Sequence, residues 1–238
     1  MHSLYFLPLW GEECMGRKMK GIFITFEGIE GCGKTTQVKL LSIRLRSHGI
    51  PVLATREPGG TTIGKSIRRI LLDAGNTAIS PKTELLLYAA DRAQHLQEVI
   101  CPGLMEGKWV LCDRFMDATE AYQGRARGQD PELIRLINNI VVQGTKPDLT
   151  LLLDLPVEIG LERALRRNSI SEVGNQDRFE KEHLSFHRNV RKAYLDLAKR
   201  EKERFALIHA DAPEEVVGEA IFQAVEPLLK ERGFARDD

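Results

Sequence analysis

Five short apolar segments recur along the chain and are rich in β-branched and aromatic residues. Segments of this length and composition, bounded by polar or glycine-containing stretches, are typical of buried β-strands. They predict strands at residues 20–27, 51–55, 109–112, 149–155 and 205–209.

Longer stretches with a helical spacing of apolar residues separate these strands. In the first of them Val38, Leu41 and Leu45 share one face, and Gly49 supplies a stop signal. The pattern predicts helices at residues 34–47, 61–74, 81–100, in two parts of 117–143 interrupted near 124–131, at 157–167, in a stretch that ends near 204, and at 213–232. Residues 168–176 are polar and lack an apolar period, so a loop is predicted there.

Strands that alternate with helices favour parallel pairing through right-handed crossovers. Strands that are apolar almost throughout indicate a sheet covered by helices on both faces. The chain contains no internal repeat, no low-complexity tract and no long linker. The sequence therefore predicts one α/β domain over residues 20–238, built in three layers around a five-stranded parallel sheet flanked by helices.

The composition narrows the functional classes. Of the 238 residues, 42% are hydrophobic and 29% are charged, which is ordinary for a globular domain. Thirty-four Lys and Arg residues balance thirty-four Asp and Glu residues. A net charge of zero argues against a general nucleic-acid coat or a polybasic membrane binder. No apolar run reaches the roughly 18 residues of a membrane span.

Residues 1–19 fit no element of this fold. They lack the leading basic residue and the small-residue cleavage site of a secretory signal. We therefore expect an N-terminal extension that is disordered or that reflects a start assigned too far upstream. The four cysteines, Cys14, Cys32, Cys101 and Cys112, form no CxxC pair and are expected to be reduced thiols in a cytoplasmic protein.

A glycine-rich segment follows the first predicted strand and opens the first predicted helix. Residues 28–35 match the phosphate-loop (P-loop) pattern G-x-x-x-x-G-K-[ST]. The glycines let backbone N–H groups converge on phosphate oxygens, Lys34 adds a charge at the β- and γ-phosphates, and the hydroxyl of Thr35 suits Mg²⁺. The predicted site for a nucleoside triphosphate consists of Gly28, Glu30, Gly31, Cys32, Gly33, Lys34, Thr35 and Thr36.

A P-loop alone does not select among ATPases, GTPases and small-molecule kinases. The chain has no Asn-Lys-x-Asp motif for reading guanine, which argues against a GTPase. It also lacks a Leu-Ser-Gly-Gly-Gln signature, which argues against a transporter ATPase.

Four further motifs follow the P-loop in order. They are TREPGGT at residues 55–61, ADRAQH at 90–95, DRFMDATEAYQG at 113–124 and DRFE at 177–180. In this order and spacing the chain closely resembles bacterial thymidylate kinases from about residue 20 to its end. The resemblance implies a P-loop kinase fold with a mobile lid, transfer of a phosphoryl group from ATP to dTMP with Mg²⁺, and a homodimer that binds neither nucleic acid nor membrane.

The residue types suit that chemistry. Transfer between two polyanions depends on positioning and on charge neutralisation, so the site requires arginines and lysines. Arg114 follows Asp113 at the carboxyl end of a predicted strand, where α/β sheets bind ligands. The resemblance makes Arg114 and Arg68 clamps on the dTMP phosphate, and Asp113 an acid that holds Mg²⁺ together with Thr35. Lys34, Arg114, Asp113 and one lid arginine are the predicted catalytic residues.

The resemblance also implies how the nucleoside is held. Tyr88 would stack on thymine, Arg92 would donate to its O4 atom, and Thr119 would meet N3–H. Tyr122 would crowd the 2′ position, and Glu30 would approach the 3′-hydroxyl. The predicted substrate-binding set is Glu30, Arg68, Tyr88, Arg92, Arg114, Thr119, Tyr122 and Gln123.

The lid is expected at about residues 167–178. Members of the family carry an arginine either in the P-loop or in the lid, and the P-loop position here is Gly31. The lid must therefore supply the arginine, and the candidates in and beside this segment are Arg163, Arg166, Arg167 and Arg178. Arg167 is the first choice because it borders the loop and shares a helical face with Arg163.

Two alternatives remain at the level of the sequence. The chain could phosphorylate another nucleotide or a nucleoside, which a substrate panel would reveal. It could instead be a regulatory P-loop ATPase that moves a partner, in which case ATP turnover would not depend on dTMP.

Overall fold

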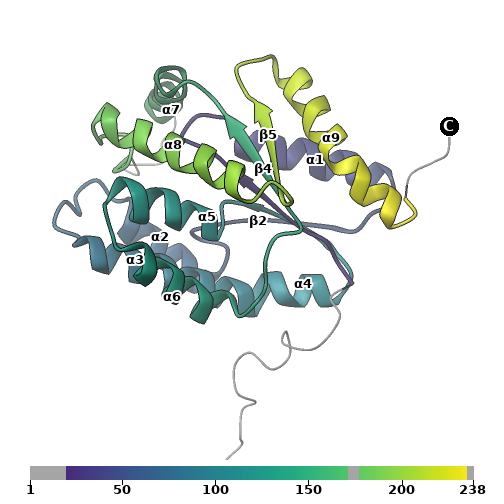
Figure 1. The fold of residues 1–238 in the computed structure, drawn as a ribbon, viewed down its shortest axis with the longest axis horizontal. Helices are drawn as coiled ribbons and strands as arrows, with labels where there is room; N and C mark the ends of the chain where they lie inside the picture. The colour runs from purple at the N-terminus through teal and green to yellow at the C-terminus, as the bar shows by residue number, and fades with distance from the viewer. Residues whose placement is uncertain (1–19, 171–176, 235–238) are drawn as a thin grey trace, which may run out of the picture.

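The computed structural model describes residues 20–170 and 177–234. Five parallel strands form one sheet in the order β2-β3-β1-β4-β5 (Figure 1). The strands are β1 (Phe23–Glu27), β2 (Val52–Arg56), β3 (Trp109–Asp113), β4 (Leu149–Asp154) and β5 (Phe205–His209). The predicted five-stranded parallel α/β sheet is confirmed.

Helices connect successive strands, and one more helix follows the last strand. They are α1 (Lys34–Ser47), α2 (Thr62–Leu72), α3 (Pro81–His95), α4 (Cys101–Met105), α5 (Met116–Thr119), α6 (Pro131–Val142), α7 (Val157–Ile170), α8 (Leu184–Arg200) and α9 (Glu214–Glu231). Two π-helical segments, η1 (Leu96–Ile100) and η2 (Glu120–Ala126), continue α3 and α5. The helices α1 and α9 lie on one side of the sheet, and α3, α4 and α6 lie on the other (Figure 1).

Three predicted boundaries are corrected. The helix expected to follow the loop and to end near residue 204 begins at Leu184 and ends at Arg200. The helix predicted at residues 81–100 continues through the π-helical segment η1 and through α4 to Met105. The loop predicted at 168–176 begins too early, since α7 extends to Ile170. Residues 1–19 and residues 171–176 of the expected lid lie outside the described residues.

Both faces of the sheet are covered by apolar side chains. Alternate residues of a strand face opposite sides. Ile24 and Phe26 of β1 therefore belong to a cluster that includes residues of α1 and α9, whereas Phe23 belongs to a second cluster with residues of η1 and α4. This double coverage explains why the strands are apolar almost throughout.

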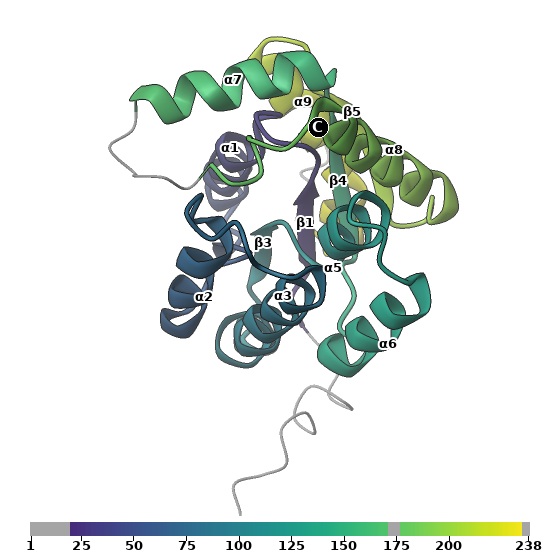
Figure 2. The ribbon, with the colours of Figure 1, turned by 90° about the vertical axis from the view of Figure 1, so that its left-hand side faces the viewer.

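The strand register brings the functional segments together. Phe26 of β1 pairs with Asp113 of β3, and Asp113 in turn pairs with Arg56 of β2. Because all three strands are parallel, the segments that follow them emerge at the same edge of the sheet. Figure 2 looks onto that edge, with α7 on one side of it and α2 and α3 on the other.

Two further expectations concern the membrane and the cysteines. Among the described helices, none is long and apolar enough to cross a membrane. Cys32 and Cys112 are free and buried, in line with the prediction of reduced thiols. Cys101 is disulfide-bonded, so that prediction is wrong at this position.

Candidate active site

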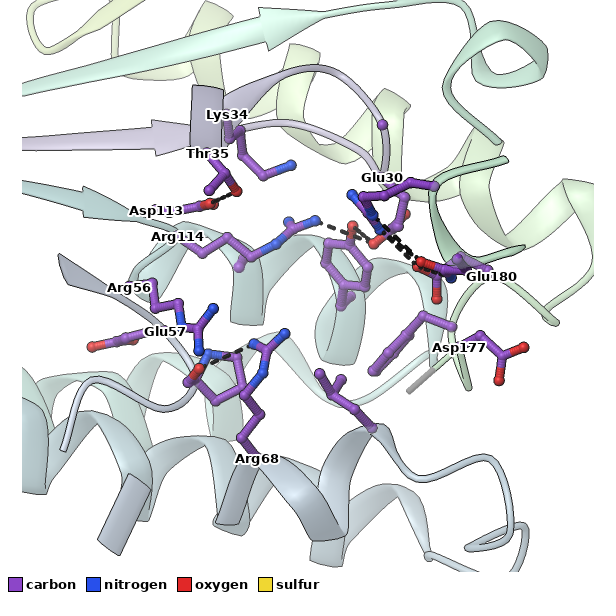
Figure 3. A pocket seen from close by; sticks show the side chains of 18 of the residues that line it. Glu30, Lys34, Thr35, Arg56, Glu57, Arg68, Asp113, Arg114, Asp177 and Glu180 are labelled. Atoms are coloured by element: carbon purple, nitrogen blue, oxygen red, sulfur yellow. Dashed lines mark hydrogen bonds and ion pairs between the residues drawn. The ribbon is translucent and has the colours of Figure 1, made fainter. Parts of the chain in front are cut away.

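A cavity of about 780 Å³ lies at the carboxyl edge of the sheet (Figure 3). The P-loop, the ends of β2 and β3, and helices α2, α3 and α7 all contribute to its wall. Most of the residues predicted from the sequence line it: Glu30, Gly31, Gly33, Lys34, Thr35, Thr36, Arg68, Tyr88, Asp113, Arg114, Thr119, Tyr122, Gln123 and Arg167. Gly28, Cys32 and Arg92 are not among the lining residues.

The P-loop has the backbone shape that its glycines predict. Gly28, Gly31 and Gly33 have φ angles of 137°, 72° and 95°, which L side chains rarely adopt. The ammonium of Lys34 donates to the carbonyl oxygens of Gly28 and Ile29, at 3.0 and 2.7 Å. The loop is thus closed around its own lysine at the N-terminus of α1, where helix N–H groups favour an anion.

Thr35 and Asp113 meet at the base of the cavity. The hydroxyl of Thr35 donates to Asp113 Oδ2 over 2.6 Å (Figure 3). Hydroxyl and carboxylate oxygens are hard ligands of the kind that Mg²⁺ prefers, and Mg²⁺ usually takes only one or two protein ligands beside phosphates and waters. These two side chains therefore fit a magnesium ion that arrives with a nucleotide.

Arginines face this P-loop end across the cavity. Arg56 ends β2 and Arg68 lies on α2, and Figure 3 shows both guanidinium groups on the same side. Burial and the charge of Arg56 lower the pKa of Arg68. Within the described part of the chain neither arginine forms an ion pair, and Arg68 bonds only to the carbonyl oxygen of Pro58, at 3.1 Å. Two cations without carboxylate partners form a site for an anion.

Arg114 connects the two ends of the cavity. It is one of two non-glycine residues with positive φ in the described chain, at 72°. Its guanidinium donates to Glu30 Oε1 and to the hydroxyl of Tyr194, both at 3.1 Å. The hydroxyl of Tyr194 donates in turn to Glu27 Oε2 over 2.7 Å. The carboxylate of Glu30 and the phenol of Tyr194 thus hold the arginine at the end of β3, and Glu27 holds the phenol.

Glu30 is the carboxylate on which several donors converge. Its Oε1 accepts from the hydroxyl of Tyr122 at 2.5 Å, and its Oε2 lies 3.3 Å from Nδ1 of His187. Burial by itself would raise the pKa of Glu30, but the hydrogen bond with His187 and the charges of Arg114 and Lys34 outweigh it and hold the pKa at about 2. Glu30 is therefore ionised at neutral pH.

The pKa of Glu27 is shifted in the opposite direction. The residue is fully buried, and besides Tyr194 it accepts from the backbone N–H of Phe115 at 2.7 Å. Burial and the charge of Asp117 raise the pKa of Glu27 to about 7, against the opposing charge of Arg114. The carboxyl group of Glu27 thus bonds to Phe115, which follows Arg114, and to Tyr194, whose hydroxyl accepts a hydrogen bond from Arg114.

Aromatic rings form one wall of the cavity. Tyr88 on α3 lies 6.5 Å from Phe179, measured between ring centroids, and Tyr122 on η2 lies 5.6 Å from the same ring. Burial raises the pKa of Tyr122, so its phenol stays protonated and donates to Glu30. The wall offers a surface on which a flat base can stack.

The predicted base reader Arg92 lies behind this wall. Its side chain is 2% exposed and donates to Glu57, Asn138, the carbonyl of Phe115 and the hydroxyl of Thr119. Thr119 lines the cavity and accepts this bond at 2.9 Å. The structure thus places Arg92 beneath Thr119, and a direct contact of Arg92 with the base stays a prediction.

The four lid arginines differ in their surroundings. Arg163 and Arg167 line the cavity, and Arg166 does not. The Arg167 side chain is 61% exposed and lies 3.5 Å from Glu180. Arg178 is bonded to the carbonyl of Leu71 at 2.5 Å and to Glu84 at 2.6 Å, so it fixes the turn after the lid instead of facing the cavity.

Several site residues escaped the sequence analysis. Arg56 stands at the carboxyl end of a strand, like Asp113. Since α/β sheets bind ligands at the carboxyl ends of their strands, the position of Arg56 in the sequence is a signal for a site residue. Glu27, Glu84, His187 and Tyr194 support other site residues, and no local pattern marks them.

The comparisons with known proteins all point to one family. The thymidylate kinase family model matches residues 26–221. The chain is 54% identical to thymidylate kinase of Geotalea uraniireducens over 211 residues, which cover 89% of this chain and 99% of that protein. It is 58% identical to thymidylate kinase of Geotalea daltonii over 189 residues, covering 79% and 88%. A crystal structure of thymidylate kinase from Ehrlichia chaffeensis aligns with a TM-score of 0.68 at 33% identity, covering 87% of this chain and 98% of that one.

Proposed function

The chain belongs to the thymidylate kinase family and phosphorylates dTMP to dTDP with ATP, and we propose that it does so with the residues of the cavity described above. The observation that carries this assignment is that Arg56 and Arg68 lie opposite the P-loop and form no ion pair with any residue that the structure describes. A regulatory ATPase has no need of a second anion site, whereas a kinase requires one for its acceptor phosphate.

In this proposal the P-loop amides and Lys34 hold the phosphates of ATP, while Arg68 and Arg114 hold the phosphate of dTMP. The acceptor oxygen belongs to an ionised phosphate, so no general base is required. The protein contributes alignment of the two phosphates and neutralisation of charge that develops during transfer. Arg114 is suited to the central position because its guanidinium is planar, always charged and held from two sides.

Thr35 and Asp113 would hold Mg²⁺, the usual companion of ATP in this family. When bound, the ion supplies neutralisation of phosphate charge and fixes the phosphate oxygens. The protein's own cations neutralise the rest of the phosphate charge. Among them, Arg167 is proposed to reach the transferring phosphoryl group when the lid closes.

The nucleoside of dTMP is proposed to lie against the aromatic wall. Tyr88 would stack on the base, Thr119 and Gln123 would bond to its edge, and Tyr122 and Glu30 would face the sugar. The position of Arg92 beneath Thr119 supports an indirect contribution to base reading beside the direct one predicted from the sequence.

The activity is tested by measuring ATP turnover with and without nucleoside monophosphates. The expected result is turnover that depends on dTMP, weaker turnover with dUMP and the weakest with dCMP, because the cytosine amino group opposes donors placed for a carbonyl oxygen. Turnover that does not depend on any monophosphate would support the ATPase alternative instead.

A homodimer is proposed on the basis of one surface. Helices α2, α3 and α6 lie side by side in Figure 1, and α3 packs against both of the others. They carry exposed apolar side chains of Ile63, Ile70, Leu86, Leu136 and Ile140. Exposed apolar residues gathered on neighbouring helices are typical of an interface. Sedimentation of the full chain should therefore give a dimer, and Ile140→Glu should shift it toward the monomer.

Residues 20–238 are proposed to act as one kinase domain, since the single sheet and the helices that cover it draw on segments from both ends of the described chain. Its substrates are small nucleotides, which supports the expected cytoplasmic location.

A further inference from the structure

A buried carboxylate of α3 joins three elements behind the aromatic wall. Glu84 is 1% exposed and lies one helical turn before Tyr88. Its Oε1 accepts from the side-chain amide Nε2 of Gln123 at 2.8 Å and from Arg127 at 3.3 Å, and its Oε2 accepts from Arg178 at 2.6 Å. A carboxylate so deeply buried is tolerated because two arginines and an amide surround it.

This arrangement determines which end of the Gln123 amide faces the base. A carboxylate between two arginines can only accept hydrogen bonds, so the amide of Gln123 must present its nitrogen to Glu84. No described residue donates to Gln123 Oε1, although the side chain lines the cavity. The carbonyl oxygen is therefore the end of the amide that remains for a ligand.

We propose that Glu84 is a specificity-determining positioning residue, which locks the amide of Gln123 so that it offers an acceptor to the base edge. The inference rests on the proposed function of the cavity. A pyrimidine with an N3–H donor, such as thymine or uracil, matches an acceptor. Cytosine has an unprotonated N3, which is itself an acceptor. N3 of cytosine and Oε1 of Gln123 would then face each other without a proton between them, and neither would form a hydrogen bond.

Glu84→Gln is the decisive substitution. A carboxamide of the same shape can donate as well as accept, so the Gln123 amide would be free to turn over and donate to N3 of cytosine. The ratio of kcat/KM for dTMP to kcat/KM for dCMP should fall at least about tenfold, mainly because kcat/KM for dCMP rises.

Two controls separate positioning from charge and from stability. Glu182 bonds to Arg127 at 2.7 Å in the same network but does not contact Gln123, so Glu182→Gln should change the ratio by less than about threefold. Glu84→Asp keeps an acceptor-only group and should preserve the ratio even where Tm falls. A merely structural role would lower kcat/KM for both substrates equally and leave the ratio unchanged.

A further variant keeps the test decisive if Glu84→Gln does not fold. Gln123→Met removes the amide and should lower the same ratio by a similar factor. An unchanged ratio in Gln123→Met, or in folded Glu84→Gln, overturns the inference. Wild-type protein without activity on dTMP would contradict the proposed function itself, which is a distinguishable outcome.

Discussion

Arg114 has an uncommon backbone conformation for a side chain of its size. A φ of 72° in a non-glycine residue costs on the order of 1 kcal/mol, and such strain persists only where the surroundings impose it. Its N–H donates to the carbonyl of Phe26 at 2.9 Å, and the next N–H, of Phe115, donates to Glu27. The turn is therefore fixed from both sides, which points the guanidinium into the cavity (Figure 3).

Tyr194→Phe should weaken dTMP binding with little effect on ATP. The variant keeps the ring but removes the hydroxyl that links Arg114 to Glu27. A hydrogen bond to a charged group contributes roughly 1.5–3 kcal/mol, so KM for dTMP should rise about tenfold or more. Steady-state kinetics with each substrate varied in turn checks the prediction. An equal rise in KM for ATP would show a general loss of structure instead.

Arg167→Ala should lower kcat at least about tenfold and change KM for dTMP little, because the contact would form mainly in the transition state. Its exposed side chain lines the cavity, and among the described residues it contacts only the neighbouring Asn168 and, at 3.5 Å, the carboxylate of Glu180, so it is able to move. Arg166→Ala on the same helix is the matched control, since that residue does not line the cavity. A large effect of Arg166→Ala with none of Arg167→Ala would contradict the assignment.

At the scale of elements, the P-loop is held against α7 as well as α1. A Cβ atom at Gly31 would lie 2.0 Å from the carbonyl oxygen of Gly160, and one at Gly160 would lie 2.6 Å from that of Glu30. Backbone meets backbone at this point, so neither position has room for a side chain. The start of the helix that carries Arg163 and Arg167 is thereby tied to the phosphate site.

Gly31→Ala should therefore destabilise the fold and raise KM for ATP, because the loop or α7 must move. Gly49→Ala is the control: its φ of 78° imposes similar backbone strain, but no atom lies within 4 Å of the added carbon. Strain alone accounts for about 1 kcal/mol, so any larger loss of unfolding free energy in Gly31→Ala measures the contact with Gly160. Denaturant unfolding compares the two. Equal losses would mean that the contact is relieved without cost.

Helix α3 shows how one element serves several parts of the site. Glu84, Tyr88 and Arg92 are spaced by four residues and lie on one face. The first orients Gln123, the second lines the cavity and the third supports Thr119. The face that would ordinarily be apolar is thus given over to buried polar contacts.

For the whole molecule, the carboxylates of Glu27 and Glu30 make the free energy of unfolding depend on pH in opposite directions. Glu30 has a pKa of about 2 in the folded state, so its stabilising contribution is present above its ordinary pKa of 4.5 and is lost as pH falls toward 2. Glu27 has a pKa raised to about 7, so the folded state holds a proton that the unfolded state has released. Its contribution is therefore complete below pH 4.5 and is lost as pH rises through 7.

Glu27→Gln removes this titration. Relative to the variant, wild-type protein should lose stability between pH 5 and pH 8, by an amount on the order of 3 kcal/mol at most. Chemical denaturation of both proteins across this range checks the difference. The exposed Glu203→Gln should give a curve parallel to that of wild type. A constant difference between wild type and Glu27→Gln would show that Glu27 does not titrate in this window.

The sequence by itself determined the sheet, most helix boundaries, the P-loop and most cavity residues, because these depend on local signals. Apolar periodicity reports burial within one element, and the glycines and Lys34 shape a phosphate site within eight consecutive residues. Parallel strands bring their carboxyl ends to one edge, which is why Asp113 and Arg114 could be placed beside the P-loop in advance.

Only the tertiary structure decided which side chains support the site. Tyr194 meets Glu27 across 167 residues, His187 meets Glu30 across 157, and Glu84 meets Gln123 across 39. The same packing placed Arg92 beneath Thr119 and bonded Arg178 away from the cavity. Such contacts depend on how α3, η2 and α8 pack against each other and against the sheet. A buried polar or charged group requires a partner, and here the partner comes from a distant element, so no pattern within one helix or strand reveals it.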